Sequence, residues 1–255
     1  MVRKVILLCG ALLLLGVTSA FALTTIDITT LTQVTDGQGV IWNSKIGQPT
    51  GTGVYDPFLR EQHNNTESGF NTDFDPVPLD DKAGIWTHSV QFSSLVTVNI
   101  GGVDYYAFNL DINEPSGPND NLISLDKFQI YESNDRALSS LAQVQASSKL
   151  FDMDAGGDEQ VNMNGDLHQG SGTDDVWVYI PKSALNFTNA NDYLYLYAAF
   201  GAAGGSLSSA DGFEEWRVLQ GPNTPPPPPP IPEPTTMVLF GSGLVGLVSG
   251  KLRKK

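Results

Sequence analysis

The chain has 255 residues, of which 14 are Lys or Arg and 28 are Asp or Glu, so its formal net charge is −14 at pH 7. Two of the basic residues precede residue 23 and four follow residue 222, whereas Glu233 is the single acidic residue outside that range. Residues 23–222 therefore hold eight basic and 27 acidic residues, a net charge of −19. Such a charge repels nucleic acid and anionic lipid and attracts cations, which excludes nucleic-acid binding as a function.

Residues 1–22 have the pattern of a secretory signal peptide. Arg3 and Lys4 precede a continuous apolar run, and Ala20 and Ala22 supply the small residues that a signal peptidase recognises. An uncleaved anchor helix is the alternative, but the apolar run is short for one. We therefore expect export of the chain and cleavage by signal peptidase after Ala22.

Residues 23–222 are long enough for one well-filled core. Cys9 is the only cysteine and lies in the signal peptide, so the core depends on packing rather than on disulfides. Alternating apolar and polar residues predict strands, and helical spacing occurs only at 137–149. The predicted strands are 24–31, 85–92, 95–100, 103–112, 122–131, 175–180, 193–200 and 213–219.

This pattern predicts a mainly β fold, specifically an antiparallel β-sandwich of the jelly-roll kind. Two long polar loops, 46–84 and 152–173, interrupt the predicted strands. Loops of that length are often functional, so both are candidate locations for a binding site.

The second loop carries a candidate calcium site. Calcium takes six to eight oxygen ligands, and carboxylates and amides alternate here around a pair of glycines. An EF-hand is excluded, because Gly156 and Met163 stand where that loop needs ligands. A solvated acidic loop that binds no ion is the alternative. The six candidate ligands are Asp152, Asp154, Asp158, Asn162, Asn164 and Asp166.

No catalytic residue is assigned from the sequence. Glu214 and Glu215 are the obvious carboxylate pair for glycoside hydrolysis, but adjacent residues of a strand point to opposite faces. One of them with a distant partner such as Asp111 is the remaining enzymatic alternative. The histidines are scattered along the chain and have no cysteine partners, so they do not show the ligand spacing of a zinc site.

Aromatic residues on the predicted strands form a candidate sugar-binding platform. Trp177, Tyr179 and Tyr195 alternate with aliphatic residues, and their rings could stack on sugar rings. Aromatic rings also fill the cores of β-sandwiches, and that interpretation stays open.

The C-terminal segment combines three features in order. Residues 223–234 form a proline-rich linker that ends in Pro232, Glu233 and Pro234, a composition that favours a stiff polyproline II spacer. Residues 235–255 contain a short apolar segment and a basic end with Lys251 and Arg253, a pattern typical of a transmembrane anchor.

These residues resemble the PEP-CTERM sorting signal of Gram-negative bacteria. The resemblance implies export across the inner membrane, transfer to an exosortase-type membrane enzyme, and attachment to the membrane at least for a time. A second resemblance, to a recurring group of exported PEP-CTERM proteins for which no activity is established, rests on six segments in order: 51–60, 69–73, 110–113, 123–131, 178–181 and 211–216.

We therefore expect a non-enzymatic protein of the cell surface or of the exopolysaccharide matrix. A carbohydrate-binding module and a polysaccharide-active glycosidase are the alternatives. Long polar loops and surface aromatics favour binding of exopolysaccharide, whereas two carboxylates that converge in a groove would favour the enzyme.

Overall fold

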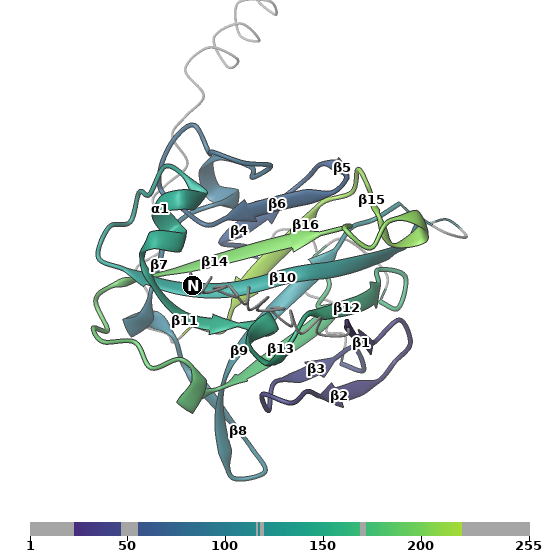
Figure 1. Ribbon diagram of the computed structural model, residues 1–255, viewed down its shortest axis with the longest axis horizontal. Helices are drawn as coiled ribbons and strands as arrows, with labels where there is room; N and C mark the ends of the chain where they lie inside the picture. The colour runs from purple at the N-terminus through teal and green to yellow at the C-terminus, as the bar shows by residue number, and fades with distance from the viewer. Residues whose placement is uncertain (1–22, 47–55, 116, 118–119, 169–171, 221–255) are drawn as a thin grey trace, which may run out of the picture.

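The computed structural model describes residues 23–46, 56–115, 117, 120–168 and 172–220, which form two large β-sheets and one small one (Figure 1). Within these described ranges, β1 and β12 pair in parallel and all other strand pairs are antiparallel. The prediction of a mainly β, antiparallel fold is confirmed. The strands are β1 Thr24–Asp27, β2 Gln33–Thr35, β3 Ile41–Asn43, β4 Leu59–Glu61, β5 Asn64–Asn65, β6 Glu67–Phe70, β7 Val90–Gln91, β8 Thr97–Ile100, β9 Val103–Ile112, β10 Leu122–Ser133, β11 Ser148–Asp152, β12 Glu159–Asn164, β13 Val176–Pro181, β14 Tyr193–Phe200, β15 Ser209–Ala210 and β16 Glu214–Val218.

Each large sheet is built around one long strand. In the first sheet, with order β1-β12-β10-β14-β6, β10 also pairs with β11, and β14 also pairs with β7. In the second sheet, with order β2-β3-β13-β9-β16-β4, β9 also pairs with β8. Figure 1 shows β10 and β14 side by side, in agreement with their shared register. The third sheet is the pair β15-β5.

The two large sheets face each other across a common hydrophobic core. Alternate residues of β9 point into this core, as the period of two requires. Phe128 of β10 crosses to the second sheet, where its ring centroid lies 5.1 Å from that of Trp216 and 5.8 Å from that of Phe108. Buried aromatic rings contribute strongly to core stability, so these contacts hold the two sheets together.

Several predicted elements differ from the observed ones. The helix α1 spans only Leu141–Ala146 of the predicted 137–149, and the Ser140 side chain caps it by accepting the N–H of Gln143. Residues 85–92 contain a 3₁₀ turn at Gly84–Trp86 and the short β7 instead of one long strand. Other 3₁₀ turns are Phe92–Ser94, Met153–Gly156, Lys182–Ala184 and Gly205–Leu207.

Both predicted polar loops contain strands. The described part of 46–84 includes β4, β5 and β6, and the segment 152–173 includes β12. In β12, Val161 and Met163 point into the core while the intervening amides point away. The loop predictions were therefore wrong in these places, because polar residues occupy the outward positions of real strands.

The segments at both ends lie outside the described residues. These are the predicted signal peptide 1–22, the linker 223–234 and the anchor 235–255. Within the described part of the chain, no helix has the length and apolar character needed to cross a membrane. The jelly-roll strand order stays a prediction.

Candidate functional site

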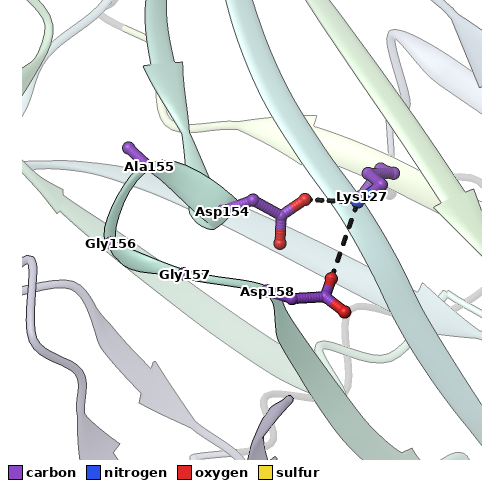
Figure 2. A pocket seen from close by; sticks show the side chains of 6 residues that line it. All are labelled: Lys127, Asp154, Ala155, Gly156, Gly157 and Asp158. Atoms are coloured by element: carbon purple, nitrogen blue, oxygen red, sulfur yellow. Dashed lines mark hydrogen bonds and ion pairs between the residues drawn. The ribbon is translucent and has the colours of Figure 1, made fainter. Parts of the chain in front are cut away.

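The acidic loop, residues 152–158, forms one wall of a shallow pocket of about 350 Å³. Figure 2 shows the Asp154 and Asp158 side chains pointing toward Lys127 of β10. Lys127 Nζ forms an ion pair with Asp154 and lies 4.0 Å from Asp158 Oδ1. The other Asp154 oxygen accepts the N–H of Glu159 at 2.9 Å. A lysine therefore already compensates the charge at the centre of the predicted calcium loop.

Asp152 is compensated in the same way. Its Oδ2 atom lies 2.7 Å from Lys149 Nζ and 3.0 Å from the amide nitrogen of Gln129. The three carboxylates of the acidic loop thus gather around lysines.

The remaining predicted calcium ligands lie elsewhere. Asn162 and Asn164 belong to β12, and Asp166 follows it. At 3.3 Å per residue, the strand separates Glu159 from Asn164 by roughly 16 Å. Asn164 Oδ1 is also occupied, since it accepts the amide of Asn121 at 2.9 Å. The six residues therefore do not surround one ion, although calcium binding at the acidic loop alone stays a prediction.

Trp177 and Tyr179 lie next to each other on the outer face of β13. Their rings stack with centroids 5.9 Å apart and an interplanar angle of 13°, and both side chains are half-buried. The guanidinium of Arg217 lies 5.4 Å from the centroid of the Trp177 ring. Asn109 occupies the register position between Trp177 and Arg217, so the three side chains form a row across three strands.

Tyr195 does not belong to this face, which corrects the predicted three-residue platform. It lies on β14 of the other sheet and is fully buried in a small cluster with Phe70, Tyr131 and Val144. Its hydroxyl donates to the carbonyl of Asp135 at 2.7 Å. Alternation along β14 could not reveal this, because the outer face of that sheet is covered by the segment around α1.

A row of charged residues crosses the same outer face as Trp177. Glu215 is the register partner of Asp111, and its Oε1 atom lies 3.6 Å from Arg60. Burial raises the pKa of Glu215 to about 7, although the nearby Arg60 lowers it. Asp175 lies on the other side of Asp111, and burial raises its pKa to about 9. Asp111 and Glu215 are both buried.

Five carboxylates that the sequence analysis did not group together meet between the two sheets. Glu214 points inward beside Trp216, opposite to Glu215, as expected for adjacent residues of a strand. The only sequence signal was its place in the inward alternation of β16. We call this group the inter-sheet carboxylate cluster; its members are Glu61, Glu67, Asp81, Glu114 and Glu214.

Residues 230–254 match the family model of the PEP-CTERM protein-sorting motif. No curated protein and no solved structure matches the chain. The match covers Pro232, Glu233 and Pro234 as well as Lys251 and Arg253, all of which lie outside the described residues. The motif implies export and membrane-attached sorting to the cell surface. The resemblance seen in the sequence is confirmed, and the chain carries the PEP-CTERM sorting motif of an exosortase substrate.

Proposed function

We propose that the protein is a non-enzymatic component of the cell surface or of the exopolysaccharide matrix. In this proposal a signal peptidase removes residues 1–22, and an exosortase-type enzyme recognises residues 232–234 and processes the anchor 235–255. Residues 23–222 then act outside the inner membrane as a jelly-roll-like β-sandwich. The sorting motif at 230–254 supports delivery to this location.

The stacked pair Trp177 and Tyr179 is the observation that carries a role in sugar binding. The two rings are nearly parallel and lie outside the core, so the parts that they do not cover on each other offer apolar contact to a sugar ring. Arg217, beside Trp177, supplies hydrogen-bond donors of the kind that orient a sugar, whereas Asn109 is buried and donates to the carbonyl of Val176. The same face therefore combines apolar contact area with polar groups.

Acidic exopolysaccharide requires a further element, because residues 23–222 carry a net charge of −19. We propose that divalent cations bridge the protein and such a polymer, and the predicted calcium loop at Asp154 and Asp158 is one place for them. Binding to acidic polymer then weakens in chelator, whereas binding to a neutral polymer does not.

The test incubates the full-length chain, purified in mild detergent, with native exopolysaccharide and measures both pull-down and new reducing ends. We expect pull-down without release of reducing ends. Trp177→Ala and Tyr179→Ala should each weaken binding about tenfold, which matches the energy of one lost aromatic contact. Tyr197→Ala, a half-buried tyrosine of the other sheet, is the matched control and should retain binding.

A polysaccharide-active enzyme is the second candidate, and the adjacency of Glu215 and Asp111 favours it. Cβ atoms of register partners on neighbouring strands lie about 5 Å apart, so their carboxyl groups are able to reach the separation of about 5 Å that retaining glycosidases use. The burial of both side chains argues against access of a polymer to them. Steady release of reducing ends that Glu215→Gln abolishes would replace the non-enzymatic proposal by this one.

A further inference from the structure

The inter-sheet carboxylate cluster combines complete burial with oxygen atoms that lack well-formed hydrogen bonds. Glu61 and Glu214 are each 0% exposed, and none of their four oxygens has such a bond within the described residues. The polar groups beside them are the backbone N–H of Gly69, next to Glu61, and the carboxyl group of Glu67, next to Glu214. Glu214 is the antiparallel register partner of Glu61, so the two side chains lie on the same face of neighbouring strands. Cβ atoms in such pairs are about 5 Å apart.

Asp81 closes the cluster on the side of β6. A Cβ atom built on Gly69 would lie 1.7 Å from Asp81 Oδ1 and 2.8 Å from Glu61 Cγ. The two acidic side chains therefore lie together over the one position of β6 that has no side chain. Neither Asp81 oxygen has a well-formed hydrogen bond within the described residues, and the donors beside it are the backbone N–H groups of Phe70 and Leu79.

Glu67 and Glu114 each have a hydrogen bond to one of their two carboxylate oxygens. One Glu67 oxygen accepts the backbone N–H of His63 at 2.8 Å, and one Glu114 oxygen accepts the N–H of Ala210 at 2.9 Å. The second oxygen of each carboxylate has no such partner in the described part of the chain. Glu67 belongs to the opposite sheet from Glu214 and interacts with it directly, so the cluster spans both sheets.

No basic side chain of the described residues forms an ion pair with this group. The ion pairs of Arg60, Lys127, Arg136, Lys149 and Arg217 all go to carboxylates outside the cluster. Buried carboxylates without a counter-charge are strongly destabilising. Protons or a bound cation must therefore neutralise them.

Protons alone satisfy the cluster incompletely. Burial raises the pKa of Asp81 to about 8 and that of Glu114 to about 7, so neutral carboxyl groups are accessible near neutral pH. A neutral carboxyl group still has an O–H and a carbonyl that need partners; the Glu214 and Glu67 groups interact with each other, but most of the remaining oxygens have no well-formed hydrogen bond within the described residues. A divalent cation, in contrast, contacts several carboxylate oxygens at once.

We propose that the inter-sheet carboxylate cluster binds a divalent cation of the calcium type, with Glu61 and Glu214 as its central ligands. The cluster's side chains offer only oxygen ligands, and His63 contributes its backbone N–H rather than its ring. An all-oxygen set of this kind favours calcium over zinc or copper. Magnesium fits less well, because it retains several waters and a closed inter-sheet site leaves little room for them.

The carboxylates must close on the ion when it binds. Among the described residues, no group of three or more His, Cys, Asp or Glu is already arranged to hold a metal ion. Carboxylates of the cluster that are ionised repel one another without a cation between them, and those that are protonated must lose the proton before they bind one. Calcium tolerates irregular geometry and accepts carbonyl and water oxygens alongside two carboxylates. The site does not depend on sugar binding by Trp177.

Isothermal titration of calcium into the chelator-treated full-length chain in mild detergent tests this proposal. We expect a saturable site at pH 7.5 whose affinity falls at least about tenfold in Glu61→Gln and in Glu214→Gln, because each removes a charged ligand. The matched control, Asp104→Asn, removes an exposed charge near the start of β9, at the opposite end of that strand from Ile112, the register partner of Glu214. It should change the affinity less than about twofold.

Circular dichroism of the same variants without calcium separates loss of the site from loss of the fold. Each Gln variant removes a like charge from the cluster, so it should be as stable as the wild type or more stable in chelator. Absence of saturable calcium binding in the wild type would overturn the proposal. So would equal binding of magnesium, or loss of binding in Asp154→Asn with Glu214→Gln unaffected.

Discussion

The acidic loop and the inter-sheet carboxylate cluster both concentrate negative charge, but they differ in what neutralises it. In the acidic loop, Asp152 and Asp154 form ion pairs with Lys149 and Lys127. In the cluster, Glu61 and Glu214 are fully buried and form no ion pair within the described residues. A run of acidic residues in the sequence therefore does not indicate where a bound cation is needed to neutralise charge. Burial of carboxylates without a counter-charge indicates it better.

The largest effect that distinguishes the two regions is the pH dependence of stability without calcium. Burial raises the pKa of Asp81 to about 8 and of Glu114 to about 7, so the folded state holds protons that the unfolded state releases above about pH 4.5. This contribution to stability is complete below that pH and is lost as the pH rises through 8. We expect the melting temperature to fall by about 5 °C or more between pH 5 and pH 8.

Thermal unfolding by circular dichroism in calcium-free buffer measures this change. Asp81→Asn should flatten the dependence, because it removes one of the titrating groups. Asp154→Asn should leave the slope unchanged. A melting temperature that rises over this range would mean that the cluster does not control the pH response.

Replacing a glycine by alanine should destabilise the protein at the inter-sheet carboxylate cluster but hardly at the acidic loop. Gly69→Ala places a Cβ atom against Asp81 and Glu61, so it should lower the free energy of unfolding by about 1–3 kcal/mol. Gly156→Ala, in the acidic loop, meets no atom within 4 Å and should change it by less than about 0.5 kcal/mol. Chemical denaturation of both variants gives the comparison, and equal effects would contradict the close packing at Gly69.

The smallest effect belongs to the ion pair of the acidic loop. Lys127 is 40% exposed, and partly exposed ion pairs contribute little. Lys127→Met should therefore lower the free energy of unfolding by about 0.2–1 kcal/mol. The same variant should leave calcium binding by the inter-sheet cluster intact. A large loss of stability would show that the loop charges depend on this lysine more than their exposure indicates.

The long strands could be predicted because their alternation is local. Residues 103–112 and 193–200 alternate over their whole length and coincide with β9 and β14. Strand β12 was missed because only Val161 and Met163 are apolar in it, between a glycine-rich turn and further polar residues. Its identity as a strand depends on pairing with β10 and β1, which are distant in sequence.

The candidate sites divide in the same way. Trp177 and Tyr179 share a face because they are two residues apart on one strand, and the period of two predicts this. Tyr195 was placed with them wrongly, because its sheet cannot be known from its own strand. The inter-sheet cluster brings together Glu61, Glu67 and Glu214 from three strands of two sheets, so no local pattern indicates it.

Calcium-dependent thermal unfolding of the full-length chain at pH 8 tests most directly that the cluster, rather than the acidic loop, is where a cation stabilises the protein. At a calcium concentration a hundredfold above Kd, binding adds about 2.7 kcal/mol, or roughly 5–10 °C in melting temperature. We expect this gain in the wild type and in Asp154→Asn, and its loss in Glu214→Gln. A gain that persists in Glu214→Gln and disappears in Asp154→Asn would contradict this account and place the ion at the acidic loop.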